Sequence, residues 1–161
     1  MKAHDHTPDT GHSAHGYSYP RFALDTVINF VIMYLVMYTM IATLDHFVLN
    51  LNNVYMTLMM VAPMTVIMLI SMRSMFPSPR VNLALIGVSV LVFALSFFGM
   101  RTQAAVGDAE FLRSMIPHHS GAILMCEQAS LSDPEIVALC REIVVAQERE
   151  INRMKAILER L

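Results

Sequence analysis

The stretch that decides the fold is VNLALIGVSVLVFALSFFGM, residues 81–100, which contains no charged side chain. About 20 consecutive apolar residues suffice for a helix to cross a hydrocarbon core of about 30 Å. Two earlier runs, Phe22–Leu44 and Val54–Met72, are of similar length. Only a helix satisfies its own backbone hydrogen bonds in lipid. The sequence therefore predicts a transmembrane block over residues 22–100, with helices at 22–44, 54–72 and 81–100.

Charge is distributed to match this block. The chain has 161 residues, 55% hydrophobic and 15% charged, whereas soluble domains are about 45–50% apolar and about 25% charged. Of the charged residues, only Asp25, Asp45, Arg73 and Arg80 lie within residues 22–100. We therefore expect a multi-pass protein whose main partner is the lipid bilayer. A net charge of −2 gives no basis for a nucleic-acid partner.

Basic residues in the short connections predict the orientation. The loop after the second run contains Arg73 and Arg80, and the head contains Lys2 and Arg21. Since cytoplasmic loops are enriched in Lys and Arg, the head is expected in the cytoplasm and the C-terminal part outside, across the plasma (inner) membrane. Arg101, just after the third run, argues the other way.

The chain beyond a linker at residues 101–108 is predicted to form an antiparallel helical hairpin over residues 109–161. The turn is marked by Ser132-Asp133-Pro134-Glu135, in which a cap residue precedes Pro in the first turn and Glu in a capping box. Apolar residues at steps of three and four predict the seam, meaning the face of each helix that packs on the other. Its predicted members are Phe111, Met115, His118, Ala122, Met125 and Ala129, facing Val137, Cys140, Val144, Gln147, Ile151, Met154, Leu158 and Leu161.

This register places His118 opposite Gln147 in an otherwise apolar seam. Buried polar groups cost about 1–3 kcal/mol unless they are partnered, so this level is either a hydrogen-bonded pair or a ligand site. His119, Met115 and Glu150 are close by in the sequence. Imidazole and thioether ligands favour copper over Mg²⁺ or Ca²⁺.

The two cysteines allow further alternatives. In the predicted register Met125, and not Cys126, faces Cys140, which disfavours a disulfide. A bridge outside the cytoplasm or a thiolate contribution to a copper site both stay open. A hairpin of this size is also marginal alone, so we expect a homo-oligomer such as a four-helix bundle, or docking on a membrane protein complex.

Residues 111–122, FLRSMIPHHSGA, resemble the hallmark of the family known as domain of unknown function 305 (DUF305). Asp133-Pro134-Glu135 and the segment AQEREINRM, residues 146–154, are similar to its second helix. The resemblance implies a ferritin-like helical bundle and an association with copper, since some members are periplasmic copper-binding proteins. The three apolar runs and the His-rich head resemble the membrane-anchored members.

Carried onto this chain, the resemblance implies the metal ligands Met115, His118, His119 and Met154, with Met125 as a further candidate. Gln147 and Glu150 join as candidates from their spacing. Leu112 stands where many members have another Met, which removes one thioether.

Two other features offer alternative metal chemistry. The head, residues 1–21, carries His4, His6, His12 and His15 in a composition typical of disorder; it is either a weak chelator or a solvated tail. In the membrane block the methionines recur every four residues at Met56, Met60, Met64, Met68 and Met72. They form either packing or a Cu(I) conduit.

No catalytic motif is recognised: the sequence lacks Glu-x-x-His pairs, a Gly-rich phosphate loop and Cys-x-x-Cys. The first hypothesis is a membrane-anchored extracytoplasmic metal-binding protein for copper sequestration or delivery. The alternative is a non-catalytic structural or interaction subunit of a larger membrane complex.

Overall fold

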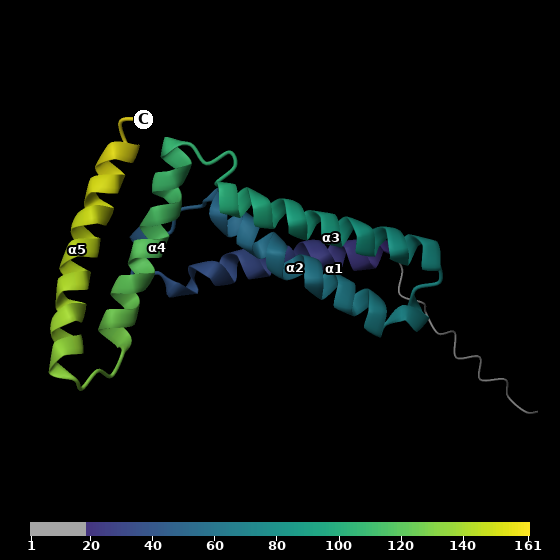
Figure 1. Cartoon of the computed structure of the whole chain (residues 1–161), viewed down its shortest axis with the longest axis horizontal. Coiled ribbons are helices and arrows are strands. Elements are labelled where there is room, and N and C mark those ends of the chain that lie inside the picture. Colours follow the sequence, from purple (N-terminus) through teal and green to yellow (C-terminus); the bar gives the residue numbers. More distant parts are fainter. Residues whose placement is uncertain (1–18) are drawn as a thin grey trace, which may run out of the picture.

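The computed structural model describes residues 19–161, and every regular element in that range is helical (Figure 1). The long helices are α1 (Tyr19–Val36), α2 (Leu51–Ser71), α3 (Pro79–Thr102), α4 (Asp108–Gln128) and α5 (Pro134–Leu158). Short 3₁₀ turns follow α1 at η1 (Met37–Met40) and η2 (Leu44–His46), and follow α2 at η3 (Arg73–Met75). The predicted all-α class is confirmed. The head histidines His4, His6, His12 and His15 lie outside the described residues.

Three helices are long and apolar enough to cross a membrane, as predicted: Tyr19–Met40, Leu51–Ser71 and Pro79–Thr102. The first ends at Met40, earlier than the predicted Leu44. The reason is tertiary: the N–H of Ala42 donates to Ser120 Oγ at 2.8 Å, and Ala42 packs against the hairpin core. This contact draws the apolar residues 41–44 out of the helix.

Small and hydroxyl side chains lie where the membrane helices pack. Thr57 on α2 and Ser89 and Ser96 on α3 are buried. Thr57 and Ser89 each donate to a backbone carbonyl one turn earlier, at 2.7 and 2.9 Å. Small residues let membrane helices approach closely. At Gly99 of α3 a Cβ would lie 3.1 Å from the Tyr55 ring of α2, so a larger residue there would push the ring away by a few tenths of an ångström.

The hairpin of α4 and α5 stands at one end of the three-helix block (Figure 1). The predicted start of α5 is confirmed, but the cap is Asp133 and not Ser132 of the predicted capping box. The Asp133 carboxylate accepts from the N–H groups of Glu135 and Ile136 at 2.9 and 3.1 Å. Helix α2 continues through Pro63 and α4 through Pro117.

The connection between α1 and α2, residues 41–50, fastens the hairpin to the block. Ser120 of α4, fully buried, accepts from Ala42 and also pairs with His46 Nδ1 at 2.8 Å. Lys155 of α5 forms an ion pair with Asp45. These contacts fix α4 against the ends of the membrane helices.

We expect Ser120→Ala to loosen this attachment. The substitution leaves the Ala42 N–H without its acceptor, and an unsatisfied buried donor costs about 1–3 kcal/mol. Amide hydrogen exchange across residues 41–50 should accelerate, while Ser130→Ala, at an exposed serine in the hairpin turn, should leave it unchanged. Equal exchange in both variants would contradict the assigned role of Ser120.

The same contact predicts a pH dependence through His46. Its pKa is lowered from its usual 6.5, chiefly because burial disfavours the charged ring and also because of Lys155, against the opposing charges of Asp45 and Glu148. The folded state binds a proton at His46 less tightly than the unfolded state does. The free energy of unfolding is therefore highest above the usual pKa and declines as the pH falls through the lowered pKa. We expect the thermal midpoint to drop between about pH 7 and pH 5, and less so in His46→Gln. An identical pH profile in the variant would refute this assignment.

Candidate metal site

Helix α4 has two packed faces, and the one against α5 differs from the predicted seam. Leu112, Ile116 and Ile123 form the core with Ile151 and Met154 of α5. The predicted seam residues Phe111 and Met125 are instead 51% and 57% exposed. The predicted register was therefore wrong by one residue on α4. The predicted seam residues and the observed core residues of α4 recur at the same helical spacing, and the more aliphatic set packs against α5.

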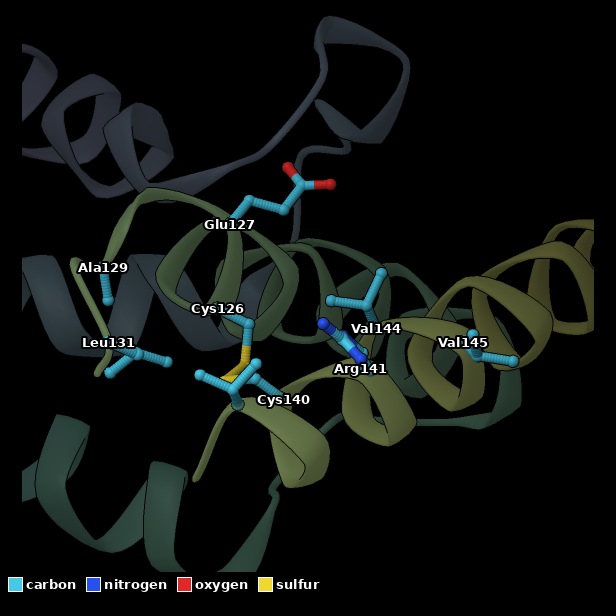
Figure 2. Close-up of a pocket in the computed structure, with 9 residues that line it drawn as sticks. Cys126, Glu127, Ala129, Leu131, Cys140, Arg141, Val144 and Val145 are labelled. Atoms are coloured by element: carbon cyan, nitrogen blue, oxygen red, sulfur yellow. A yellow bond between two sulfur atoms is a disulfide. The ribbon is translucent and has the colours of Figure 1, made fainter. Parts of the chain in front are cut away.

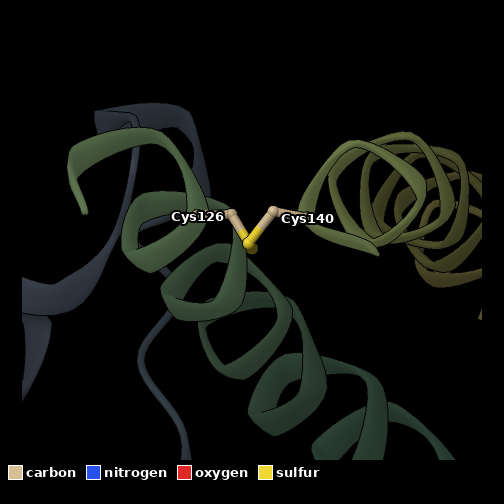
Figure 3. Close-up of a disulfide and its surroundings, with 2 residues drawn as sticks. All are labelled: Cys126 and Cys140. Atoms are coloured by element: carbon tan, nitrogen blue, oxygen red, sulfur yellow. A yellow bond between two sulfur atoms is a disulfide. The ribbon is translucent and has the colours of Figure 1, made fainter. Parts of the chain in front are cut away.

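The shifted register brings the two cysteines together. Cys126 and Cys140 form a disulfide with a Cα–Cα distance of 5.3 Å, next to the hairpin turn (Figure 2, Figure 3). The expectation that Met125 would face Cys140 and disfavour a bridge was wrong. The described residues contain no free cysteine, so no thiolate is left for a metal.

His119 lies on the α5 side of α4. Its Nδ1 is 2.9 Å from the Met115 carbonyl and its Nε2 is 2.9 Å from Glu150 Oε2. Both partner atoms are acceptors, so the ring satisfies both only by donating from both nitrogens. Ligation of a metal by His119 requires giving up one of these bonds.

None of the remaining α5 candidates lines the cavity to which His118 belongs. Met154 is 9% exposed and belongs to the hydrophobic core. Gln147 is half-buried on α5, and Glu150 is engaged with His119. The structure therefore divides the predicted ligand set between the two faces of α4.

His118, Met115 and Met125 line a second space beside α4, and Met115 also packs against the hairpin core. This space is a cavity of about 450 Å³ between α4 and the nearby ends of the membrane helices. The imidazole of His118 and two thioethers from the same helix are thus brought to one space.

Sequence reasoning considered Met56 only as packing or as part of a Cu(I) conduit and did not place the other half of this cavity beside the hairpin. Four further methionines line the cavity, namely Met37 and Met40 of η1, Met56 of α2 and Met100 of α3. The available signal was the position of these methionines at the ends of the spans nearest the hairpin. The four-residue recurrence along α2 instead suggested a path through the middle of the membrane.

The cavity is polar in places but uncharged. Among the described residues that line it, none is Asp, Glu, Lys or Arg. Asn52 Oδ1 and Ser114 Oγ, which belong to lining residues, are buried and have no hydrogen-bond partner.

This donor set suits a soft metal ion. Over residues 19–161 no group of three or more His, Cys, Asp or Glu side chains is placed to hold a metal, so a hard or borderline dication lacks a conventional site there. Thioethers with imidazole are the ligands that Cu(I) prefers. The residues present therefore fit a copper ion as cargo.

A second cavity lies beside the disulfide (Figure 2). Its lining is largely aliphatic, with Leu131, Val144 and Val145 near the bridge. The Glu127 carboxylate points away from the cysteine pair (Figure 2). With both sulfurs engaged in the disulfide, this cavity offers no soft ligand.

Three apolar helices that carry a helical hairpin on one end define a membrane protein with a hairpin domain. The family described as Domain of unknown function (DUF305) matches residues 99–158. The chain is 36% identical over 113 residues to an uncharacterized protein of Acanthamoeba polyphaga mimivirus. This alignment covers 69% of this chain and 72% of that protein. The chain belongs to the DUF305 family.

That alignment is longer than the part of this chain from residue 99 to the end, so the similarity includes part of the membrane block. No solved structure matches the chain.

Proposed function

We propose that this protein is a membrane-anchored, extracytoplasmic metal-binding protein that holds copper for sequestration or delivery. The observation that carries the proposal is the cavity where His118 and Met115 meet other thioethers. Soft ligands without a neighbouring carboxylate favour Cu(I) over Zn²⁺, Mg²⁺ or Ca²⁺. No enzymatic activity is proposed.

Two observations support a hairpin outside the cytoplasm. Arg73 in η3 and Arg80 in the first turn of α3 flank the connection at the opposite end of the membrane block from the hairpin, and basic residues in such connections favour the cytoplasmic side. The Cys126–Cys140 disulfide is a feature of oxidising compartments. We propose the plasma (inner) membrane as the location of the protein.

The test is a titration of the full-length protein in mild detergent. Cu(I), held by a competing chromophoric chelator under anaerobic conditions, is expected to bind at about one ion per chain and far more tightly than Zn²⁺. A variant with Ala at His4, His6, His12 and His15 should keep this binding, which assigns it to the described part of the chain. Absence of Cu(I) binding, or equal affinity for Zn²⁺, would contradict the proposal.

A second candidate is an interaction subunit. Helix α5 exposes the apolar side chains of Ile136 and Leu139, which lie one turn apart, and exposed apolar side chains on one face favour contact with a second copy or a larger membrane complex. This function requires no metal. Mass measurement of the detergent-solubilised protein distinguishes a lone chain from an assembly.

A further inference from the structure

The cavity at α4 is shared between the hairpin and the membrane block. Its thioethers come from η1, α2 and α3 as well as from α4. The end of the first span, the start of α2 and the end of α3 all lie on the hairpin side of the block (Figure 1). One face of the cavity thus belongs to the membrane helices and the other to the hairpin.

Position, and not exposure, sets the cavity methionines apart. Met40 and Met56 are 48% and 40% exposed, and Met64 of α2, which does not line the cavity, is 44% exposed. Other methionines of α2 do not line the cavity, among them Met59, Met60, Met64 and Met68. The methionine content of the block therefore does not by itself place thioethers at this position.

The charge of the cavity further narrows the class of ion. With no acidic lining residue, a dication would bring two uncompensated charges into a partly desolvated space, whereas a monovalent ion brings one. Thioethers are neutral ligands, so they leave the charge of the ion unchanged. Both considerations favour a monovalent soft cation.

We propose that the metal site is composite and takes Cu(I). Met37, Met40, Met56 and Met100 supply thioethers from the membrane side, opposite the His118 face of the hairpin. This inference rests on the proposed function and adds a second set of ligands. An ion held in this site contacts both the membrane block and the hairpin.

The experiment replaces the four membrane-side methionines with Leu in the full chain, M37L/M40L/M56L/M100L. Met→Leu nearly conserves volume and removes only the thioether. The matched control, M59L/M60L/M64L/M68L, changes the same number of methionines outside the cavity. Cu(I) affinity is measured in detergent by competition with a chromophoric chelator, and circular dichroism checks the helical content of each variant.

We expect the cavity quartet to weaken Cu(I) binding about 10- to 100-fold, the scale on which metal sites respond to loss of supporting groups. The control quartet should bind like the wild type. If the cavity quartet does not fold, the pairs M37L/M40L and M56L/M100L replace it, and each should weaken binding by about 10-fold.

The outcomes separate the two proposals. Wild-type affinity in the cavity quartet, together with weakened binding in His118→Ala, would overturn the composite site and leave the proposed function intact. Equal weakening by the control quartet would also overturn it and favour a conduit along the membrane helices. A wild-type chain that does not bind Cu(I) would overturn both.

Discussion

Replacement of His118 with Ala is expected to weaken Cu(I) binding about 10- to 100-fold, whereas replacement of its neighbour His119 with Gln should leave the affinity near the wild-type value. His118 lines the methionine cavity. His119 faces α5, where its ring pairs with Glu150 and with the Met115 carbonyl. The contrast between adjacent residues therefore reports which face of α4 binds the metal.

Adding Met115→Leu to His118→Ala removes the second α4 ligand that lines the cavity near it, and we expect Cu(I) binding to fall below detection. The measurement is competition with a chromophoric Cu(I) chelator on the full chain in detergent. Weakening by His119→Gln equal to that of His118→Ala would mean that the ion lies between the two faces, as the family resemblance alone implied, and would contradict the assignment to the cavity.

The other large effect concerns stability. Ile116 of α4 is fully buried and packs with Ile151, itself 1% exposed, in the hairpin core. Truncation of such a side chain to Ala costs about 2–5 kcal/mol, from lost burial and from the cavity left behind. We expect Ile116→Ala to lower the free energy of unfolding by this amount, measured by denaturant titration in mild detergent with circular dichroism.

Leu139→Ala is the matched control, because Leu139 is 54% exposed on α5. Substitutions at such surface positions change stability by less than about 0.5 kcal/mol. If Phe111→Ala were as destabilising as Ile116→Ala, the seam would be the one predicted from the sequence, and the packing described above would be wrong.

Much of the fold follows from local signals in the sequence. An uncharged apolar stretch such as residues 81–100 has one stable form in lipid. The start of α5 at Asp133-Pro134 follows from cap chemistry that involves only neighbouring residues. These features depend on the chain within a few residues, and the sequence displays them directly.

Which face of α4 packs against α5 could not be predicted from such local signals. A helix packed on one side shows one stripe, but α4 packs against α5 on one side and against the membrane block on the other. Met115 and His118 lie at a helical spacing typical of a seam, and so do Ile116 and His119. The choice between them depends on the connection at residues 41–50, which buries Ser120.

The cavity illustrates the same limit. Met37, Met56 and Met100 come from three different helices and meet only through the packing of those helices around α4. The spacing along any one helix does not reveal this meeting. The Cys126–Cys140 bridge was misjudged for a related reason, since it depends on a one-residue change in register.

The central claim is that this chain binds Cu(I) through thioethers and one imidazole. X-ray absorption spectroscopy on the Cu(I)-loaded, full-length protein tests it most directly, because the spectrum identifies the atoms bound to the metal. The account predicts a first shell dominated by sulfur with a histidine nitrogen, and loss of the nitrogen signal in His118→Ala. A shell of nitrogen and oxygen atoms without sulfur would contradict it.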